Sequence, residues 1–241
     1  MPPKGRPRAQ WNDDPELISI IAHELKTPIS SMQLAIQTMV RAYGRGRASP
    51  ELLCKVMKTV EKQGRRLARD VDNLLDSSRI ARGALALELS EVDLSSIVLG
   101  VASEARERLA QADCALTVQA QTPVVGLWDL LRLEQVVTHL LGNAIEHASG
   151  APVDIAVEEV GDAALLSVVD RGPGIPDELR ARLFEPFVRV RSARGGPGLG
   201  LGLYIVRGSV GMLGGSVEIA SQEGGGTSVR VRLPRGGPRS A

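Results

Sequence analysis

Cysteine and aromatic residues are scarce in this sequence of 241 residues. Its two cysteines, Cys54 and Cys114, are too few for a disulfide framework or a zinc cluster. We expect each to be a small core residue in a reducing compartment, which favours a cytoplasmic location. With two Trp, two Tyr and two Phe, a platform of stacked rings for nucleic acid is not expected.

Charge of one sign and long apolar runs are also missing. The 29 basic and 28 acidic residues give a net charge of +1, without the basic excess typical of nucleic-acid binding. No stretch approaches the ~18 consecutive apolar residues of a membrane span. Residues 1–10 are basic, but no apolar run of a secretory signal follows them. With 43% hydrophobic residues, the chain can form one large core or two small ones.

A seven-residue apolar repeat predicts two helices before residue 83. The repeat positions are Ile18, Leu25, Met32 and Met39, followed by Leu53, Val60, Leu67 and Leu74. Between the two runs, residues 44–50 form a predicted loop, with Ser49 as N-cap and Pro50 as the first helical residue. The result is an antiparallel hairpin. Its apolar stripes are too broad for two helices to enclose, so we expect a homodimer that forms a four-helix bundle.

After Gly83, short strand-like runs alternate with helix-like runs. The expected strands are 85–89, 115–120, 153–158, 164–169, 216–219 and 227–233. The expected helices are 94–112, with Asp93 as N-cap, 129–148 and 201–213. This pattern predicts one sheet with helices on one face.

His23 is the first candidate for chemistry. It lies on the side of its helix opposite the seam, five residues before the helix-bending Pro28. Glu24 can accept a proton from one ring nitrogen, which makes the other nitrogen more nucleophilic. Thr27, one turn on, shares the face of His23. Taken alone, this segment also fits an ordinary surface histidine.

Further candidates follow in the second half. His139, Asn143 and His147 recur every four residues on one helix, and the amide of Asn143 suits Mg²⁺ together with phosphates. A three-ligand transition-metal site is the alternative. Asp170 ends a strand before spaced glycines and suits the amine of adenine, although an ordinary Gly-Pro turn fits as well. Residues 195–203 form a glycine-rich helix start, which suits an anion or is merely a flexible loop.

The order of the motifs is more specific than any one of them. They are His-Glu-x-x-Thr-Pro at 23–28, Asn-Ala-x-x-His at 143–147, Asp-x-Gly-x-Gly-Ile at 170–175, Phe-Glu-Pro-Phe-x-Arg at 184–189, Gly-Leu-Gly-Leu-Gly-Leu at 198–203 and Gly-Gly-Gly-Thr at 224–227. Over about residues 14–233 this chain resembles the catalytic core of the sensor histidine kinases of bacterial two-component systems.

The resemblance implies an α+β fold in two domains. An antiparallel helical hairpin over 14–83 would form the dimeric four-helix bundle for dimerisation and histidine phosphotransfer. An α/β sandwich over 84–233 would be the ATP-binding catalytic domain, as in gyrase-type and Hsp90-type ATPases. Residues 1–13 and 234–241 would be a disordered N-terminus and a disordered tail.

The resemblance also implies a role for each candidate. His23 would be the phosphoacceptor, Glu24 would assist its deprotonation, and Thr27 would help water attack the phosphorylated regulator. Asn143 would be the ligand of Mg²⁺, and His147 would lie in the same ATP-binding motif. Asp170 would read the adenine, with Gly172 and Gly174 beside it. Arg189 would contact a phosphate, and Gly198, Gly200 and Gly202 would cover the phosphates. The lid would be roughly residues 190–197.

The implied function is an ATP-dependent histidine kinase that autophosphorylates and passes the phosphoryl group to the receiver domain of a response regulator. The sequence departs from the family pattern at His139, where Asn is usual, at Glu146, where Lys is usual, and at His147, where an aromatic is frequent. One alternative is therefore a weakly active kinase or a pseudokinase that binds or dephosphorylates a regulator. Another is a relative that drives a clamp with ATP or phosphorylates serine.

No sensor module is expected in the sequence before the first helix. The chain is then either a fragment of a longer kinase or a small kinase that receives its signal from a separate sensor protein.

Overall fold

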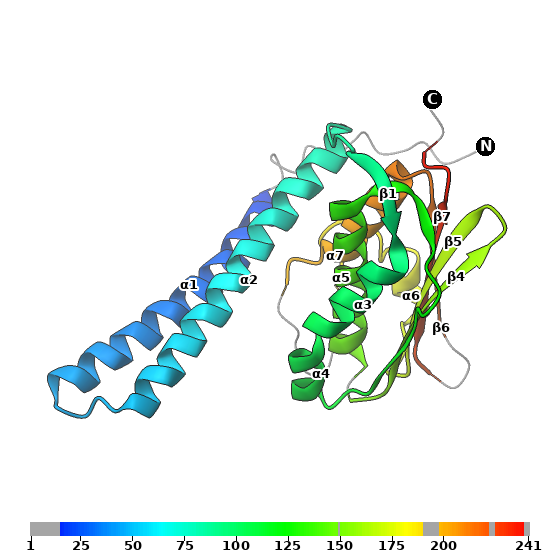
Figure 1. Ribbon diagram of the computed structural model, residues 1–241. Helices are drawn as coiled ribbons and strands as arrows, with labels where there is room; N and C mark the ends of the chain where they lie inside the picture. The colour runs from blue at the N-terminus through cyan, green and yellow to red at the C-terminus, as the bar shows by residue number, and fades with distance from the viewer. Residues whose placement is uncertain (1–14, 149, 190–197, 222–224, 239–241) are drawn as a thin grey trace. The chain divides into compact units, whose positions relative to one another are not determined.

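The structure is a computed structural model that describes residues 15–148, 150–189, 198–221 and 225–238 (Figure 1). The chain passes from a first compact unit to a second between Ala81 and Arg82. The first unit is helical and the second mixes helices with strands, which confirms the predicted α+β class. The segments 1–13 and 190–197, predicted as a disordered N-terminus and a lid, lie outside the described residues.

The first unit is the predicted hairpin of two long helices. Helix α1 spans Pro15–Gly44 and helix α2 spans Pro50–Arg82. The hydroxyl of Ser49 caps α2, since it accepts the backbone N–H of Leu52 at 3.2 Å. Among the described residues, no helix combines the length and the apolar character needed to cross a membrane.

Large apolar side chains remain exposed on both helices of the hairpin. They are Ile18, Ile20, Ile29, Leu34, Ile36, Val40 and Tyr43 on α1, and Leu53, Met57, Val71 and Leu75 on α2. Cys54 is exposed as well, so the prediction that it is a core residue is wrong. The buried residue of this part of α2 is Val56, and a separation of two positions turns the Cys54 side chain about 200° around the helix from it. Cys114 is buried, as predicted.

The second unit contains the remaining helices and strands. In chain order they are β1 (Leu89–Asp93), α3 (Leu94–Glu104), α4 (Arg106–Ala112), β2 (Leu116–Gln119), β3 (Val125–Asp129), α5 (Leu130–His147), β4 (Val153–Val160), β5 (Ala163–Asp170), α6 (Asp177–Arg180), α7 (Gly202–Met212), β6 (Ser216–Ser221) and β7 (Thr227–Pro234).

These strands form two sheets, not the single sheet that we predicted. The larger has five strands in the order β2-β4-β5-β7-β6, in which β2 and β4 are parallel and the other pairs antiparallel. The smaller is an antiparallel ribbon of β1 and β3. Helices α3, α5 and α7 lie together on one side of the larger sheet (Figure 1). This arrangement agrees with the predicted helices on one face and with an α/β sandwich.

The core of the second unit lies between the helices and the larger sheet. Alternate residues of β4 and β5 face it, including Ile155, Leu166 and Val168, while Leu133 and Leu140 of α5 cover them. These side chains are at most 2% exposed, so the layer that carries the ends of β5 and α5 is closely packed.

Three expectations about individual elements need correction. The strand expected at 85–89 starts only at Leu89, because its hydrogen-bonding partner is β3, which the sequence pattern did not indicate. The helix expected at 94–112 is divided at Ala105, although the bond from its N–H to the carbonyl of Val101 continues the helical ladder. Ordered structure also continues past Pro234, where we predicted a disordered tail, since the Arg235 N–H donates to the carbonyl of Asp162.

Candidate active site

His23 lies exposed on α1, on the side of the helix predicted from the apolar repeat. The helix continues without interruption through Pro28. Thr27, one turn later, is also exposed and donates its hydroxyl to the backbone carbonyl of His23 at 2.9 Å. The predicted sharing of a face by His23 and Thr27 is therefore confirmed. An exposed imidazole in this setting is accessible to an electrophile.

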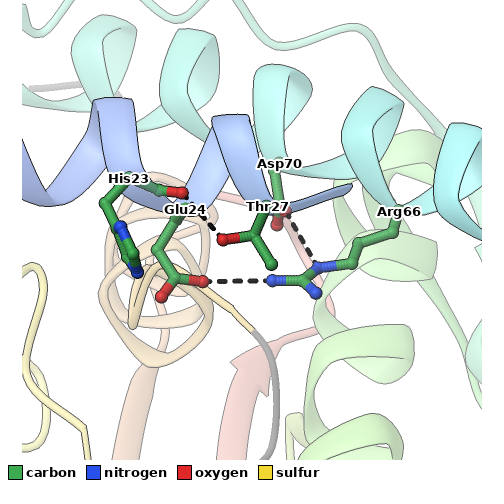
Figure 2. A network of polar contacts seen from close by, with 5 residues as sticks. All are labelled: His23, Glu24, Thr27, Arg66 and Asp70. Atoms are coloured by element: carbon green, nitrogen blue, oxygen red, sulfur yellow. Dashed lines mark hydrogen bonds and ion pairs between the residues drawn. The ribbon is translucent and has the colours of Figure 1, made fainter. Parts of the chain in front are cut away.

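Glu24 is held by a residue of the neighbouring helix. The Arg66 guanidinium of α2 donates from Nη2 to Glu24 Oε2 at 3.0 Å (Figure 2). Asp70, one turn further along α2, forms an ion pair with the same guanidinium at 3.5 Å. Arg66 and Asp70 are not among the site residues predicted from the sequence. The available signal was the apolar repeat, since Asp70 lies three residues after the seam residue Leu67.

A second cluster forms where β5 ends. Asp170 is its last residue and is 6% exposed. Burial raises the pKa of its carboxyl above the usual range, while hydrogen bonds from Gly172 and Thr227 and the nearby His147 oppose that rise. The Gly172 N–H donates to Asp170 Oδ1 at 2.9 Å. The result is a buried carboxylate, which can accept hydrogen bonds from a ligand's N–H groups.

Thr227 also belongs to the cluster around Asp170, although it is not among the predicted site residues. It pairs with Asp170 across β5 and β7, although 57 residues separate them in sequence. It donates hydrogen bonds from both backbone and side chain to the Asp170 carboxylate. The Gly-Gly-Gly-Thr motif was the available signal, but a motif does not indicate the strand with which it pairs.

Close packing requires glycine at two positions of this cluster. A Cβ on Gly172 would lie 2.5 Å from the carbonyl oxygen of His147. Gly200 has a φ of +69°, and a Cβ there would lie 2.7 Å from the carbonyl oxygen of Val188 and 2.9 Å from Cγ of Arg189. Arg189 is exposed, and Gly174 and Gly198 are half-buried.

Helix α5 brings its polar face to the start of α7. An ideal Cβ on Gly202, the first residue of α7, would lie 3.4 Å from His139 Nδ1 and 3.8 Å from Asn143 Oδ1. His147, one turn after Asn143, is near Asp170. Asn143, His147, Asp170, Gly172 and Gly202 therefore form one continuous area. Among the described residues, no three His, Cys, Asp or Glu side chains gather in a way that would hold a metal ion.

This area on α5, β5 and the start of α7 fits a nucleoside triphosphate bound together with a hard cation. Asp170 provides a buried acceptor, and Asn143 provides an amide oxygen of the kind that Mg²⁺ takes. The backbone N–H groups and the positive dipole at the start of an 11-residue helix such as α7 favour an anion beside Asn143. The area therefore joins a buried carboxylate to a helix start whose dipole favours an anion.

Two known families match the chain, in the order of the two units. Residues 16–83 match the "His Kinase A (phospho-acceptor) domain". Residues 128–237 match the "Histidine kinase-, DNA gyrase B-, and HSP90-like ATPase".

Individual proteins match over most of the chain. The alginate biosynthesis sensor protein KinB of Pseudomonas aeruginosa is 33% identical over 226 residues, which cover 91% of this chain and 36% of KinB. The histidine kinase AdeS of Acinetobacter baumannii has a similar structure, with a TM-score of 0.67, 27% identity, and coverage of 88% of this chain and 98% of that one. The mycobacterial sensor histidine kinase MprB is 30% identical, with a TM-score of 0.55 and coverage of 63% of this chain and 100% of that one. The chain spans between 24% and 57% of the length of the curated relatives that we compared.

Proposed function

This chain belongs to the sensor histidine kinase family of two-component systems, and we propose that it transfers the terminal phosphoryl group of ATP to His23. From there the group would pass to an aspartate in the receiver domain of a response regulator. The observation that carries the proposal is the exposed imidazole beside a carboxylate within the phosphoacceptor domain. The second unit supports it with an ATPase fold whose buried Asp170 and anion-binding helix start suit ATP.

In the proposed first step, one ring nitrogen of His23 attacks the terminal phosphorus of ATP. The new N–P bond forms as the P–O bond to ADP breaks, and the Glu24 carboxylate accepts the proton from the other ring nitrogen. Thr27 has a proposed role in the opposite reaction, where it helps a water molecule to remove the phosphoryl group from the regulator. Its exposure next to His23 supports that role.

The proposed nucleotide site is made by residues of α5, β5 and the start of α7. Asp170 accepts a hydrogen bond from the exocyclic amine of adenine, and Gly172, Gly174 and His147 surround it. Asn143 is the protein ligand of Mg²⁺, whose charge neutralises the phosphates. The proposed phosphate contacts are Arg189, Gly198, Gly200 and Gly202. The proposed domain bounds are 14–83 for dimerisation and phosphotransfer and 84–233 for ATP binding.

We further propose that the hairpin forms a homodimer. Val40, Met57 and Leu75 are 64%, 62% and 52% exposed, and exposed apolar side chains of this size favour burial against another surface. A second copy of the hairpin would cover them in a four-helix bundle. The proposal places this dimer in the cytoplasm, with a separate sensor protein as one possible source of its signal.

Labelling with γ-³²P-ATP and Mg²⁺ tests the proposed kinase activity. The parent chain and His23→Ala are compared, with Lys26→Ala as a control for loss of an exposed side chain on the same helix. We expect acid-labile, base-stable label on the parent and on Lys26→Ala, and none on His23→Ala.

Two results would contradict the proposal. Label that persists in His23→Ala would place the phosphoryl group elsewhere. No label at all on a folded dimer would overturn the kinase activity and favour the alternative of a protein that binds or dephosphorylates a regulator.

A further inference from the structure

One guanidinium connects two carboxylates beside His23. Arg66 contacts Glu24 of α1 through Nη2 at 3.0 Å and Asp70 of α2 through Nε at 3.5 Å. The side chains of Arg66, Glu24 and Asp70 are 15%, 19% and 9% exposed. The pairs are therefore shielded from water, unlike the exposed ion pair between Arg65 and Glu61 one position earlier. In Figure 2 the Glu24 carboxylate lies between the imidazole and the guanidinium in the view.

Asp70 occupies a position that the helix repeat assigns to the seam. It lies three residues after Leu67 and four before Leu74, and Val56 and Ser77, at steps of seven from it, are buried too. Burial raises the pKa of the Asp70 carboxyl, the charges of Arg66 and Arg69 oppose that rise, and the charge of Glu24 adds to it. An apolar residue would fit this seam at a lower desolvation cost. Packing alone therefore does not explain a carboxylate at this position, and the side chain with which it forms an ion pair is Arg66.

We propose that Arg66 is a positioning residue for the phosphorylation of His23, and that Asp70 in turn positions Arg66. This inference rests on the proposed kinase function. Arg66 holds the Glu24 carboxylate on the side of the helix where His23 lies, so that Glu24 is in place when the imidazole loses its proton. Without this contact, a glutamate on a helix surface rotates among several staggered conformations.

Asp70 has two effects in this arrangement. Its ion pair with Nε attracts one side of the guanidinium, while Nη2 donates to Glu24. It also shares the positive charge of the guanidinium, so that Arg66 is paired with two carboxylates and not with Glu24 alone. Arginine suits the role because its fork of donors reaches two carboxylates at once, which a lysine ammonium does less well.

The rate of His23 phosphorylation at saturating ATP–Mg²⁺ tests the inference. Arg66→Met keeps most of the aliphatic length and removes the charge, and Arg65→Met is the matched control, since Arg65 is 77% exposed on the same helix. Because positioned proton acceptors contribute about 10²–10⁴-fold, we expect at least a ~10-fold slower rate for Arg66→Met. Arg65→Met should stay within about twofold of the parent. The KM for ATP should not change in either variant, and Arg66→Lys should recover part of the rate.

A double-mutant cycle separates positioning from a merely structural role. If Arg66 acts through Glu24, then Arg66→Met in a Glu24→Gln background should slow phosphorylation by less than about twofold further. Arg66→Met combined with Asp70→Leu guards against a folding defect, because it removes both buried charges and restores an apolar seam. We expect this pair to fold as a stable hairpin and still to be slow.

The outcomes distinguish the inference from the function on which it rests. If the parent is not labelled on His23, the proposed function fails. If the parent is labelled and folded Arg66→Met matches its rate, only the positioning role fails. Equal slowing by Arg66→Met with and without Glu24 would also overturn it, because Arg66 would then act independently of Glu24.

Discussion

Gly172 offers a sharp test of the nucleotide site, because its replacement by alanine adds a single methyl group. An ideal Cβ there would lie 2.5 Å from the carbonyl oxygen of His147, 3.0 Å from Asp170 Oδ1 and 3.1 Å from Cα of Ala148. Two of these neighbours are backbone atoms and the third is the proposed adenine-reading carboxylate. Alanine therefore forces the end of α5 or the Asp170 side chain to move.

The size of the effect follows from these distances. Overpacking of a tightly packed site costs about 1–3 kcal/mol, so we expect the free energy of unfolding of Gly172→Ala to fall by that amount. A displaced Asp170 also loses its hydrogen bond to the ligand. A hydrogen bond to a charged group contributes about 1.5–3 kcal/mol, which corresponds to a ~10- to 150-fold weaker affinity for ATP.

Gly211→Ala is the matched control for this substitution. Gly211 lies in α7, and no atom lies within 4 Å of its ideal Cβ. Alanine in a helix is favoured over glycine by up to about 1 kcal/mol, so this variant should be as stable as the parent or more so. Its affinity for ATP should be unchanged.

Two measurements are needed, one for stability and one for binding. Unfolding in urea can be followed by the fluorescence of Trp128, which is fully buried in the second unit, in a Trp11→Phe background. Nucleotide affinity is measured by calorimetry with ATP and Mg²⁺. If folded Gly172→Ala bound ATP as tightly as Gly211→Ala, then Gly172 and Asp170 would not border the nucleotide, and the proposed site would be refuted.

Four further predictions concern the two units separately. Thr27→Ala should slow dephosphorylation of the regulator by about tenfold or more. Thr38→Ala should not, although it loses the same kind of hydrogen bond to the carbonyl four residues earlier. An assay of regulator dephosphorylation checks this, and equal slowing by both variants would contradict the role of Thr27. Burial raises the pKa of Asp170, so on acidification this carboxylate should take up its proton at a higher pH than an ordinary aspartate, and the affinity for ATP should fall there. Calorimetry over a pH series checks this. An affinity that does not change with pH would argue against an ionised Asp170 in binding. Burial also raises the pKa of Asp70, so the free energy of unfolding of the hairpin should fall as the pH rises through that pKa. Circular dichroism melts over a pH series check this, and the fall should be smaller in Asp70→Leu, which has no carboxyl at this position. Equal falls in the parent and in Asp70→Leu would contradict the reasoning. Glu146→Lys, which replaces a negative charge in the proposed ATP-binding motif by a positive one, should strengthen ATP binding a few-fold, and weaker binding would show that Glu146 contributes to the site.

The helical hairpin was predictable because its determinants are local. The seven-residue repeat assigns both helices, and Ser49 followed by Pro50 marks the start of the second, where the cap is indeed found. The same reasoning placed His23 on the outer side of α1. Each of these conclusions depends on residues that are close in sequence.

The ribbon of β1 and β3 was not predictable in the same way. Leu85–Leu89 has strand-like composition, but the strand begins at Leu89, where the backbone finds a partner around Asp129. Composition indicates that a segment can be extended. The hydrogen bonds that make it a strand come from a segment about 40 residues away, and only the fold brings the two together.

The order of the motifs by itself determined the family and most of the candidate residues, because each motif is a short run with a fixed spacing. Only the tertiary structure decided which other residues support them. Thr227 reaches Asp170 through the register of β5 and β7, and Arg66 reaches Glu24, 42 residues earlier, across two helices. Such contacts depend on how helices and strands pack, and packing joins side chains whose separation along the chain follows no fixed rule.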